Sequence, residues 1–438
     1  MQRTLIQSLA AWKERPGHKP LILKGARQVG KTWLAKEFGA QYYENYVYIN
    51  FDNNPRMNAL FSGDLSIKRI IEGIEIEAGI KIDSAKTLLI FDEVQETPRA
   101  LTSLKYFNEN APEYDIIAAG SLLGIALHPG TSFPVGKVES LELRPLSFEE
   151  FALALGEKRF IDLLKSGDYK LITAFHEQLS ELLKKYYFIG GMPEAVVCFT
   201  ETGDFNAVRK IQKRILETYQ EDFSKHAPIL IAPRIKLLWN SLPAQLAREN
   251  RKFVYGIIKE GARARDYEVA LQWLEDCGLI YKVYRLSIPR LPLPACQDFN
   301  AFKIYAVDVG LLSCMAELNP RLLLEGNQLF KEFKGALTEQ YVLQELKTMP
   351  DIQTYYWSAD KGTAEVDFVL GSGTRFLPGD AIPLEVKAER NLQAKSLKSY
   401  SEQFKPELAI RTSLSEYHET KAFADVPLYA IKAWIDEL

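Results

Sequence analysis

Short apolar runs separated by helix-like segments organise the first third of the chain. Each run has the length of a buried strand, and the segments between them carry apolar residues at three- and four-residue spacing. Buried strands that alternate with helices are typical of a parallel, doubly wound α/β sheet. The predicted strands lie at 21–23, 46–54, 87–92 and 114–123, and the alternation continues to about residue 145.

The middle of the chain changes to a helical pattern. Between residues 148 and 226, apolar residues recur at helical spacing, for example in LSELLKKYYFIGGMPEAV. Residues 252–286 then predict two helices followed by the alternating strand GLIYKVYRL, which is the outline of a winged helix. Such a module can place its second helix in a DNA groove. Its few basic residues and the acidic string WLEDCGLI leave a protein-docking or spacer role open.

The last third carries charges where the pattern predicts a half-buried strand. IPLEVKAE, residues 382–389, alternates as a strand, yet Glu385 and Lys387 stand among apolar neighbours. Residues two apart on a strand point to the same face, so these two charges project together. The same region predicts a helix at 334–346 and a hairpin-like pair of strands at 354–370.

Composition sets limits on partners and compartment. The chain has 438 residues and a net charge of −3, so contact with nucleic acid would need a local basic patch. Cys198, Cys277, Cys296 and Cys314 show neither a CxxC pair nor zinc-ligand spacing, which favours reduced thiols in a cytoplasmic protein. No apolar run approaches the roughly 20 residues of a membrane helix. The N-terminal segment also lacks the apolar core of a signal peptide.

A phosphate-binding loop follows the first predicted strand. Residues 25–32 read GARQVGKT, which fits G-x-x-x-x-G-K-[ST] between a strand and a helix. The glycines let backbone N–H groups turn inward onto phosphate oxygens, and the helix N-terminus adds partial positive charge. Lys31 is expected to reach the β- and γ-phosphates of ATP and Thr32 to ligate Mg²⁺. The predicted ATP-binding residues are Gly25, Ala26, Arg27, Gln28, Val29, Gly30, Lys31 and Thr32.

A second apolar strand ends in acid, as the other half of an ATP site requires. TLLIFDEVQ, residues 87–95, places Asp92 at the carboxyl end of a strand, where open α/β sheets bind ligands. Asp92 is expected to hold the Mg²⁺ shell and Glu93 to polarise the attacking water. The strand at 114–123 ends near Ser121, which is predicted to sense the γ-phosphate, with a simple strand-end cap as the alternative role.

Three further strings accompany the two ATP motifs: SLLG at 121–124, LRPLSFEEF at 143–151 and GGMPEAV at 190–196. Together they resemble a large family of prokaryotic AAA-type ATPases with an uncharacterised C-terminal region, from about residue 21 to 399. The resemblance implies a helical lid and leaves a monomer, a dimer or a ring open. Family members usually carry Gly-Arg before PLSFEEF, where this chain has Gly136-Lys137. Lys137 would be a non-bidentate substitute for a phosphate-binding arginine, and compensation by Arg144 is left open.

Three carboxylates of the last third are expected to meet around one divalent cation. Glu339 lies in the predicted helix, Asp367 in the second strand of the hairpin, and Glu385 on the strand after it. Burial of such charges is costly unless something pairs them, and Mg²⁺ or Mn²⁺ would do so. Lys387 would then orient or activate the water that attacks a phosphodiester.

This order of acids resembles the PD-(D/E)XK nuclease fold. The strings that match are AEVDFVL, which contains Asp367, and PLEVKAE, which contains Glu385 and Lys387. Val366 rather than a proline precedes Asp367, and Glu365 is expected to face away from the metal. The resemblance implies a restriction-endonuclease-like α/β domain at the C-terminal end of the chain.

The combined prediction has four parts. They are a P-loop AAA-type ATPase core at 1–147, a helical lid at 148–226, a winged-helix-like unit at 227–300 and a nuclease-like α/β domain at 301–438. The leading hypothesis is an ATP-hydrolysing ATPase coupled to a metal-dependent nuclease-like domain that cleaves or binds nucleic acid. The alternative is a nucleotide-dependent signalling or scaffold ATPase with a non-cleaving binding module. Nucleic acid, a protein partner and a homo-oligomer are all open, and no membrane association is expected.

Overall fold

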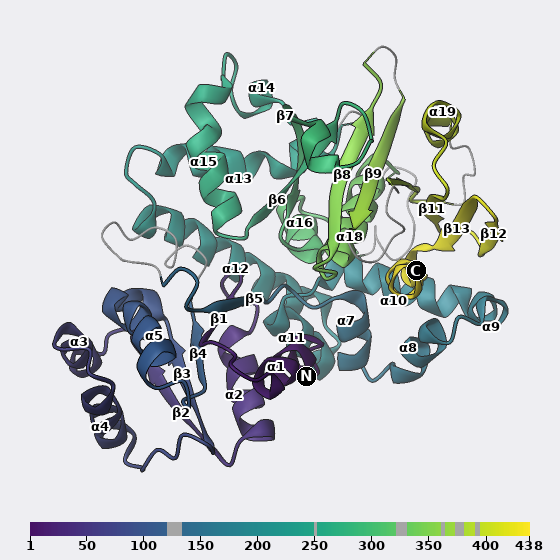
Figure 1. Ribbon diagram of the computed structural model, residues 1–438. Coiled ribbons are helices and arrows are strands. Elements are labelled where there is room, and N and C mark those ends of the chain that lie inside the picture. Colours follow the sequence, from purple (N-terminus) through teal and green to yellow (C-terminus); the bar gives the residue numbers. More distant parts are fainter. Residues whose placement is uncertain (121–133, 249–251, 321–330, 361–363, 373–380, 390–394) are drawn as a thin grey trace. The chain divides into compact units, whose positions relative to one another are not determined.

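The chain folds into two compact units, shown in Figure 1. The computed structural model describes residues 1–120, 134–248, 252–320, 331–360, 364–372, 381–389 and 395–438. The N-terminal unit contains residues 2–144 and 276–278, and the C-terminal unit contains residue 1, residues 145–275 and residues 279–438. Among the described residues, no helix is both long enough and apolar enough to cross a membrane.

A five-stranded parallel sheet forms the centre of the N-terminal unit. Its strand order is β2-β3-β4-β1-β5, so β4 lies between the strands that precede the two predicted ATP motifs. This confirms the predicted doubly wound parallel sheet. The strands are β1 (Leu21–Lys24), β2 (Asn45–Asn50), β3 (Thr87–Asp92), β4 (Ile116–Ala119) and β5 (Glu139–Glu142).

Helices cover both faces of this sheet, as Figure 1 shows. Alternate strand residues point to opposite faces. One set, including Ile22, Leu89 and Phe91, is buried against α3, α4 and α5, while α2 packs on the other face. Burial on both sides explains why β1, β3 and β4 are largely continuous apolar runs. The helices are α1 (Leu5–Glu14), α2 (Lys31–Tyr42), α3 (Pro55–Ser62), α4 (Ile67–Ala78) and α5 (Pro98–Asn110), with a 3₁₀ turn η1 (Val94–Glu96).

The C-terminal unit begins with a run of helices, in agreement with the predicted helical pattern. Capping is local: Ser147 and Glu150 form a reciprocal capping box at the start of α7, in the string PLSFEEF. The helices are α7 (Phe148–Ala154), α8 (Lys158–Lys165), α9 (Tyr169–Ala174), α10 (His176–Ile189), α11 (Pro193–Thr202), α12 (Phe205–His226), α13 (Ala232–Leu246), α14 (Tyr255–Ile258) and α15 (Ala264–Asp276).

An eight-stranded mixed sheet of order β12-β13-β11-β10-β9-β8-β6-β7 forms the rest of this unit. Its middle follows the chain order α18, β8, β9, β10, α19, β11. The pairs β8–β9 and β9–β10 are antiparallel and β10–β11 is parallel. The strands are β6 (Ile280–Leu286), β7 (Gln297–Ala306), β8 (Ile352–Ser358), β9 (Glu365–Ser372), β10 (Ile382–Val386), β11 (Ala409–Ser413), β12 (His418–Thr420) and β13 (Phe423–Pro427).

Helices pack against this second sheet as well. Leu397 and Tyr400 of α19 are buried with Trp357, Val366 and Val369 of β8 and β9, and α18 contacts β8 and β10. Apolar residues on α19 and on the two strands therefore meet in one core. The remaining elements are η2 (Leu293–Cys296), α16 (Val309–Met315), α18 (Lys331–Lys347), α19 (Lys395–Phe404), η4 (Leu428–Ala430) and α20 (Ile431–Glu437).

The string GGMPEAV packs against a buried aspartate. Asp308 caps α16 and accepts hydrogen bonds from Leu311 N at 2.9 Å and Gly191 N at 2.6 Å. A Cβ on Gly190, whose φ is +73°, would lie 2.1 Å from Asp308 Oδ1, so only glycine fits there. Burial raises the pKa of Asp308. These contacts give the segment a structural role.

The strand of the predicted winged helix, observed as β6, is part of the large sheet. β6 pairs with β7 and also with β8, so the predicted boundary at residue 300 falls inside β7. The predicted parts 148–226, 227–300 and 301–438 all lie in the C-terminal unit. Their division into separate domains stays a prediction.

Candidate functional sites

The loop GARQVGKT has the backbone of a phosphate cradle. Gly25, Gln28 and Gly30 have φ values of 151°, 65° and 95°, and Gly30 precedes the first residue of α2. A Cβ on Gly25 would lie 2.2 Å from Leu143 O, so this position requires glycine. Positive φ values next to a helix N-terminus turn several N–H groups to one side, which is the arrangement that binds phosphate oxygens.

Lys31 closes this loop on itself. Its Nζ donates to Gly25 O at 2.9 Å and to Ala26 O at 2.8 Å. Desolvation lowers the pKa of Lys31 to about 8, against the opposing attraction of Glu93 and Asp92. The lysine therefore lies at the cradle with hydrogen bonds that incoming phosphate oxygens would replace.

Asp92 is the meeting point of the two ATP motifs. Its Oδ2 accepts from Thr32 Oγ1 at 2.7 Å and from Tyr48 OH at 2.9 Å. Asp92 is buried at the carboxyl end of β3. A hydroxyl and a carboxylate in contact are hard oxygen ligands suited to Mg²⁺, so Thr32 and Asp92 fit the predicted metal role. The role of Tyr48, whose phenol helps to orient Asp92, was not predicted from the sequence.

Glu93 takes a left-handed conformation directly after the strand. Its φ is 50°, its N–H donates to Asp92 Oδ1 at 3.0 Å, and its carboxylate accepts from Gln95 Nε2. A non-glycine residue held at positive φ is strained, and such strain is concentrated at functional sites. The two acids therefore have different partners: Asp92 contacts Thr32 and Tyr48, whereas Glu93 contacts Gln95. Different partners are compatible with different roles for the two acids.

The basic residues around this site have defined partners. Lys137 pairs with Glu109 at 2.9 Å and Arg144 with Glu142 at 2.7 Å. Arg3, buried and not anticipated from the sequence, donates to Val29 O at 3.0 Å and Arg144 O at 2.5 Å, and so braces the loop. Ser121 lies outside the described residues, and its predicted sensor role stays a prediction.

Two of the three predicted acids of the last third lie together. The antiparallel register of β9 and β10 ends at the pair Leu384 and Phe368, which are the chain neighbours of Glu385 and Asp367. Val386 N donates to Asp367 Oδ2 at 2.8 Å. The charge of Asp367 also raises the pKa of Glu385, so the two carboxylates lie close to each other.

Glu385 has the features of a cation ligand. The residue is 4% exposed, and its Oε2 has no hydrogen-bond partner among the described residues. Burial, and then the charge of Asp367, raise the pKa of Glu385 to about 7, while Lys387 and Lys303 oppose the shift. A buried oxygen without a partner beside a second carboxylate fits a divalent cation bound by Asp367 and Glu385.

Glu339 does not complete a three-carboxylate set. Among the described residues, no group of three or more His, Cys, Asp or Glu side chains could hold a metal ion. Glu339 Oε2 instead accepts from Tyr305 OH at 3.2 Å and lies 4.0 Å from Lys303 Nζ. Glu339 therefore has Tyr305 and Lys303 as partners, and its role as a metal ligand stays a prediction.

Glu365 is also part of this arrangement, and the expectation that it faces away was wrong. Its Oε1 lies 2.5 Å from Lys303 Nζ. Residues two apart on a strand share a face, so Glu365 accompanies Asp367. Lys303 was not predicted as a site residue, although it lies inside the apolar run AFKIYAV just as Lys387 lies among apolar neighbours.

Lys387 directly follows β10 and remains partly exposed. Its Nζ donates to Glu385 Oε1 at 2.6 Å, and its backbone N–H donates to Thr412 O at 2.8 Å. With 31% of its side chain exposed, the ammonium can reach a ligand from solvent while it holds Glu385.

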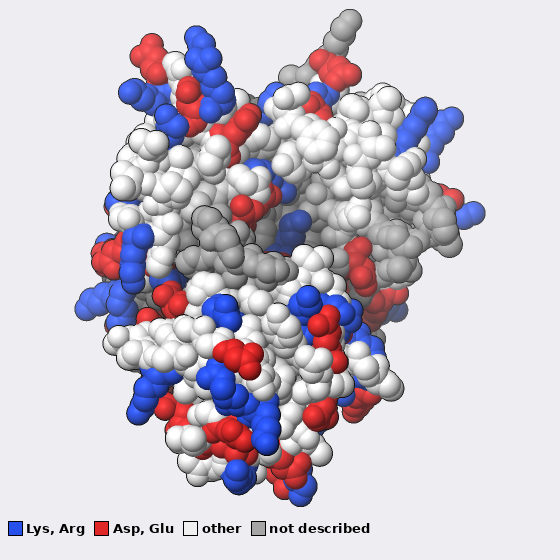
Figure 2. All heavy atoms as spheres, turned by 60° about the vertical axis from the view of Figure 1, so that its left-hand side comes forward, with Lys and Arg blue, Asp and Glu red and all other residues white. Residues whose placement is uncertain are grey.

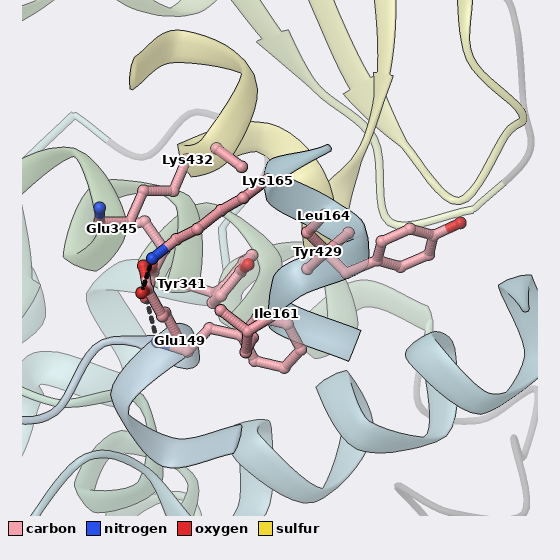
Figure 3. A pocket seen from close by; sticks show the side chains of 10 residues that line it. Glu149, Ile161, Leu164, Lys165, Tyr341, Glu345, Tyr429 and Lys432 are labelled. Atoms are coloured by element: carbon pink, nitrogen blue, oxygen red, sulfur yellow. Dashed lines mark hydrogen bonds and ion pairs between the residues drawn. The ribbon is translucent and has the colours of Figure 1, made fainter. Parts of the chain in front are cut away.

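Glu345 marks a separate small pocket in the C-terminal unit (Figure 3). The pocket measures about 20 Å³, enough for about one water. Glu345 Oε1 accepts from Phe148 N at 2.8 Å, while Oε2 has no partner among the described residues. Burial raises the pKa of Glu345 to about 8. The pocket also contains Glu149, Lys165 and Lys432, but it is too small for a nucleotide.

Charge on the described surface is mixed. On the face shown in Figure 2, Lys and Arg side chains are interspersed with Asp and Glu side chains. Arg285 at the end of β6 pairs with Asp298 at 3.7 Å and with Asp360. No extended basic patch covers the described residues of that face.

Comparisons with known proteins agree with the first of these sites. Residues 17–152 match the model of an AAA domain family, which includes the phosphate-binding loop and the Asp92-Glu93 pair. The N-terminal third is therefore an AAA-type P-loop ATPase, and the predicted ATP-hydrolysing enzyme is confirmed. Residues 180–322 match a domain of unknown function (DUF8612) and residues 334–431 another (DUF4143). Neither match names an activity, so the winged-helix and nuclease-like assignments stay predictions.

Solved structures provide weaker similarities. The Walker-type ATPase PABY2304 of Pyrococcus abyssi is 15% identical, with 71% of this chain and 94% of that chain covered and a TM-score of 0.44. The Aeropyrum pernix ORC1 protein in complex with DNA is 13% identical, with coverage of 72% and 90% and a TM-score of 0.28. With TM-scores below 0.5, these similarities carry no functional conclusion. Among curated proteins no match to the sequence is found.

Proposed function

We propose that this AAA-type ATPase is coupled to a metal-dependent, nuclease-like C-terminal domain that acts on nucleic acid. The observation that carries the proposal is the proximity of Asp367 and Glu385, which lie on adjacent strands, with Lys387 beside them. The chain order of α18, three strands, α19 and β11, with β10 and β11 parallel, supports a PD-(D/E)XK-like core. ATP turnover would regulate access of that core to its substrate.

In the ATPase reaction, the residues of the cradle position the triphosphate. The N–H groups of the loop bind phosphate oxygens, and the Lys31 ammonium exchanges its two carbonyl acceptors for the β- and γ-phosphates. Mg²⁺, when bound with ATP, neutralises charge on those phosphates. Thr32 and Asp92 hold their oxygens ready for it, and Glu93 accepts hydrogen bonding from the attacking water.

At the C-terminal site, a divalent cation would supply Lewis-acid polarisation of a phosphodiester. Asp367 and Glu385 would hold the cation. Lys387, held by Glu385 yet partly exposed, would orient the attacking water or stabilise the charge that develops on the phosphate. The exposed Lys398 on α19 is available for contact with a phosphate backbone.

The test compares full-length wild type with Lys31→Ala and Asp367→Asn. Each protein is assayed for phosphate release from ATP with Mg²⁺ and for cleavage of single- and double-stranded DNA and RNA with Mn²⁺. We expect Lys31→Ala to lose ATP hydrolysis and Asp367→Asn to lose cleavage while it hydrolyses ATP. Cleavage that is equal in wild type and Asp367→Asn would refute the proposed metal site.

A second function is supported by the mixed surface charge and by the neutralised Arg285. In this version the nuclease-like fold binds a partner without cleavage, and the β6–β7 region docks protein. Absence of cleavage by wild type on all four substrates, together with normal ATP hydrolysis, would favour it.

A further inference from the structure

Lys303 is a buried ammonium on β7 with two glutamates around it. It is 0% exposed, and its Nζ lies 2.5 Å from Glu365 Oε1 and 4.0 Å from Glu339 Oε2. The same Nζ lies 5.0 Å from the centre of the Tyr356 ring. Burial of a lysine is expensive unless its charge is paired. Lys303, Glu339 and Glu365 therefore form one electrostatic group.

This group lies at the predicted metal site although β7 is distant from β9 in the strand order. The Tyr305 and Phe368 rings are 6.0 Å apart, so the sheet curls and brings β7 over the face of β9. Tyr305 OH donates to Glu339, which fixes that carboxylate toward β7. The charge of Lys303 also acts on Glu385 and lowers its pKa, so β7 brings this ammonium close to the proposed metal site.

The charges of this face indicate how many metal ions it can take. The carboxylates are Glu339, Glu365, Asp367 and Glu385, and the ammonium groups are Lys303 and Lys387. Two negative charges are left uncompensated, which one divalent cation would neutralise. The buried oxygen without a partner belongs to Glu385, whereas Glu339 and Glu365 already contact Lys303.

We propose that the Lys303 ammonium neutralises Glu339 and Glu365 and so keeps these two acids from binding a metal ion. The site then binds one divalent ion and not two, through Asp367 and Glu385. The inference rests on the proposed metal site and specifies its stoichiometry. Lys303 is a positioning residue: it contacts the neighbouring acids and sets which of them are available.

The experiment counts Mn²⁺ bound to full-length, nucleotide-free protein by electron paramagnetic resonance of the free ion. The Asp367→Asn/Glu385→Gln double variant provides the blank. We expect wild type to bind one Mn²⁺ more than the blank, and Glu339→Gln and Glu365→Gln to change the Kd by less than about threefold. Loss of Lys303 frees two acids, so Lys303→Met should bind one further Mn²⁺, which Glu339→Gln in the same chain removes.

Lys282→Met is the matched control, since Lys282 is a largely buried lysine on β6 that pairs with Glu275 at 2.7 Å. It should bind the same number of ions as wild type. If Lys303→Met fails to fold, as judged by circular dichroism, the single glutamine variants decide. Two ions in wild type, or a tenfold loss of affinity in Glu339→Gln, would overturn the inference alone. Equal binding by wild type and the blank would overturn the proposed metal site as well.

Discussion

The phosphate-binding loop and the C-terminal acid site use the same ingredients in different ways. Both place a lysine among carboxylates and backbone groups. In the first, the lysine donates to loop carbonyls six and five residues before it, and the acid partners follow one strand. In the second, the charges come from β7, α18, β9 and the end of β10. A local site depends on its own backbone, whereas a dispersed site depends on the curl and register of a whole sheet.

The largest expected effect is on the rate of ATP hydrolysis at the first site. Glu93→Gln removes the group that accepts hydrogen bonding from the attacking water, and we expect ATP hydrolysis to fall by about 100-fold or more. ATP binding, measured by calorimetry, and Mn²⁺ binding at the C-terminal site should remain. A variant that hydrolyses ATP at the wild-type rate would remove Glu93 from the mechanism. Glu96→Gln is the matched control, because Glu96 is the exposed residue of the adjacent turn η1.

The second prediction concerns Mn²⁺ binding at the C-terminal acid site. Glu385→Gln keeps the shape of the side chain but removes one charged ligand, a contact of ~2 kcal/mol, so Mn²⁺ should bind about 10- to 100-fold more weakly. ATP hydrolysis should stay within about twofold of wild type. Titration of Mn²⁺ beside a phosphate-release assay gives both values. Unchanged Mn²⁺ affinity would mean that the unpartnered carboxylate does not bind the ion.

Glu345 provides a comparison with Glu385 for the effect of burial on the pKa of a glutamate. It is buried as Glu385 is, but its carboxylate accepts a hydrogen bond from Phe148 N. Its pKa is about 8 in the folded protein against 4.5 ordinarily. The folded state keeps a proton that the unfolded state loses, so stability falls as pH rises from about 4.5 to about 8. Glu345→Gln should remove this fall and gain on the order of 2 kcal/mol over wild type at pH 8.

Urea unfolding at pH 5 and pH 8 checks this expectation. Wild type and Glu345→Gln should differ little at pH 5 and clearly at pH 8. Parallel losses of stability in the two proteins would show that Glu345 is not the titrating group.

The smallest expected effect concerns Lys137. Its ion pair with Glu109 is partly exposed, and ion pairs near the surface contribute about 1 kcal/mol or less. Lys137→Met should therefore change ATP hydrolysis by less than about twofold. A tenfold fall in the rate would instead assign Lys137 to the phosphates, in the role that the family resemblance gives to arginine.

The amino-acid sequence determined the parts of this protein that are local in the chain. The parallel sheet, the phosphate-binding loop and the acid pair after β3 were all predicted, because apolar periodicity, glycine at positive φ and strand-end acids act over a few residues. In the last third, the helix at 334–346, the strand pair at 354–370 and the strand at 382–389 were predicted for the same reason, whereas the strands and the helix after residue 405 were not.

Only the tertiary structure decided which acids share a partner. The sequence grouped Glu339 with Asp367 and Glu385, whereas the curled sheet turns Glu339 and Glu365 toward Lys303. The tertiary structure also joined the strand of the predicted winged helix to the large sheet and placed Arg3 in contact with the phosphate-binding loop. Such contacts join residues far apart in the chain, and their choice depends on the competition among buried charges for the nearest counter-charge.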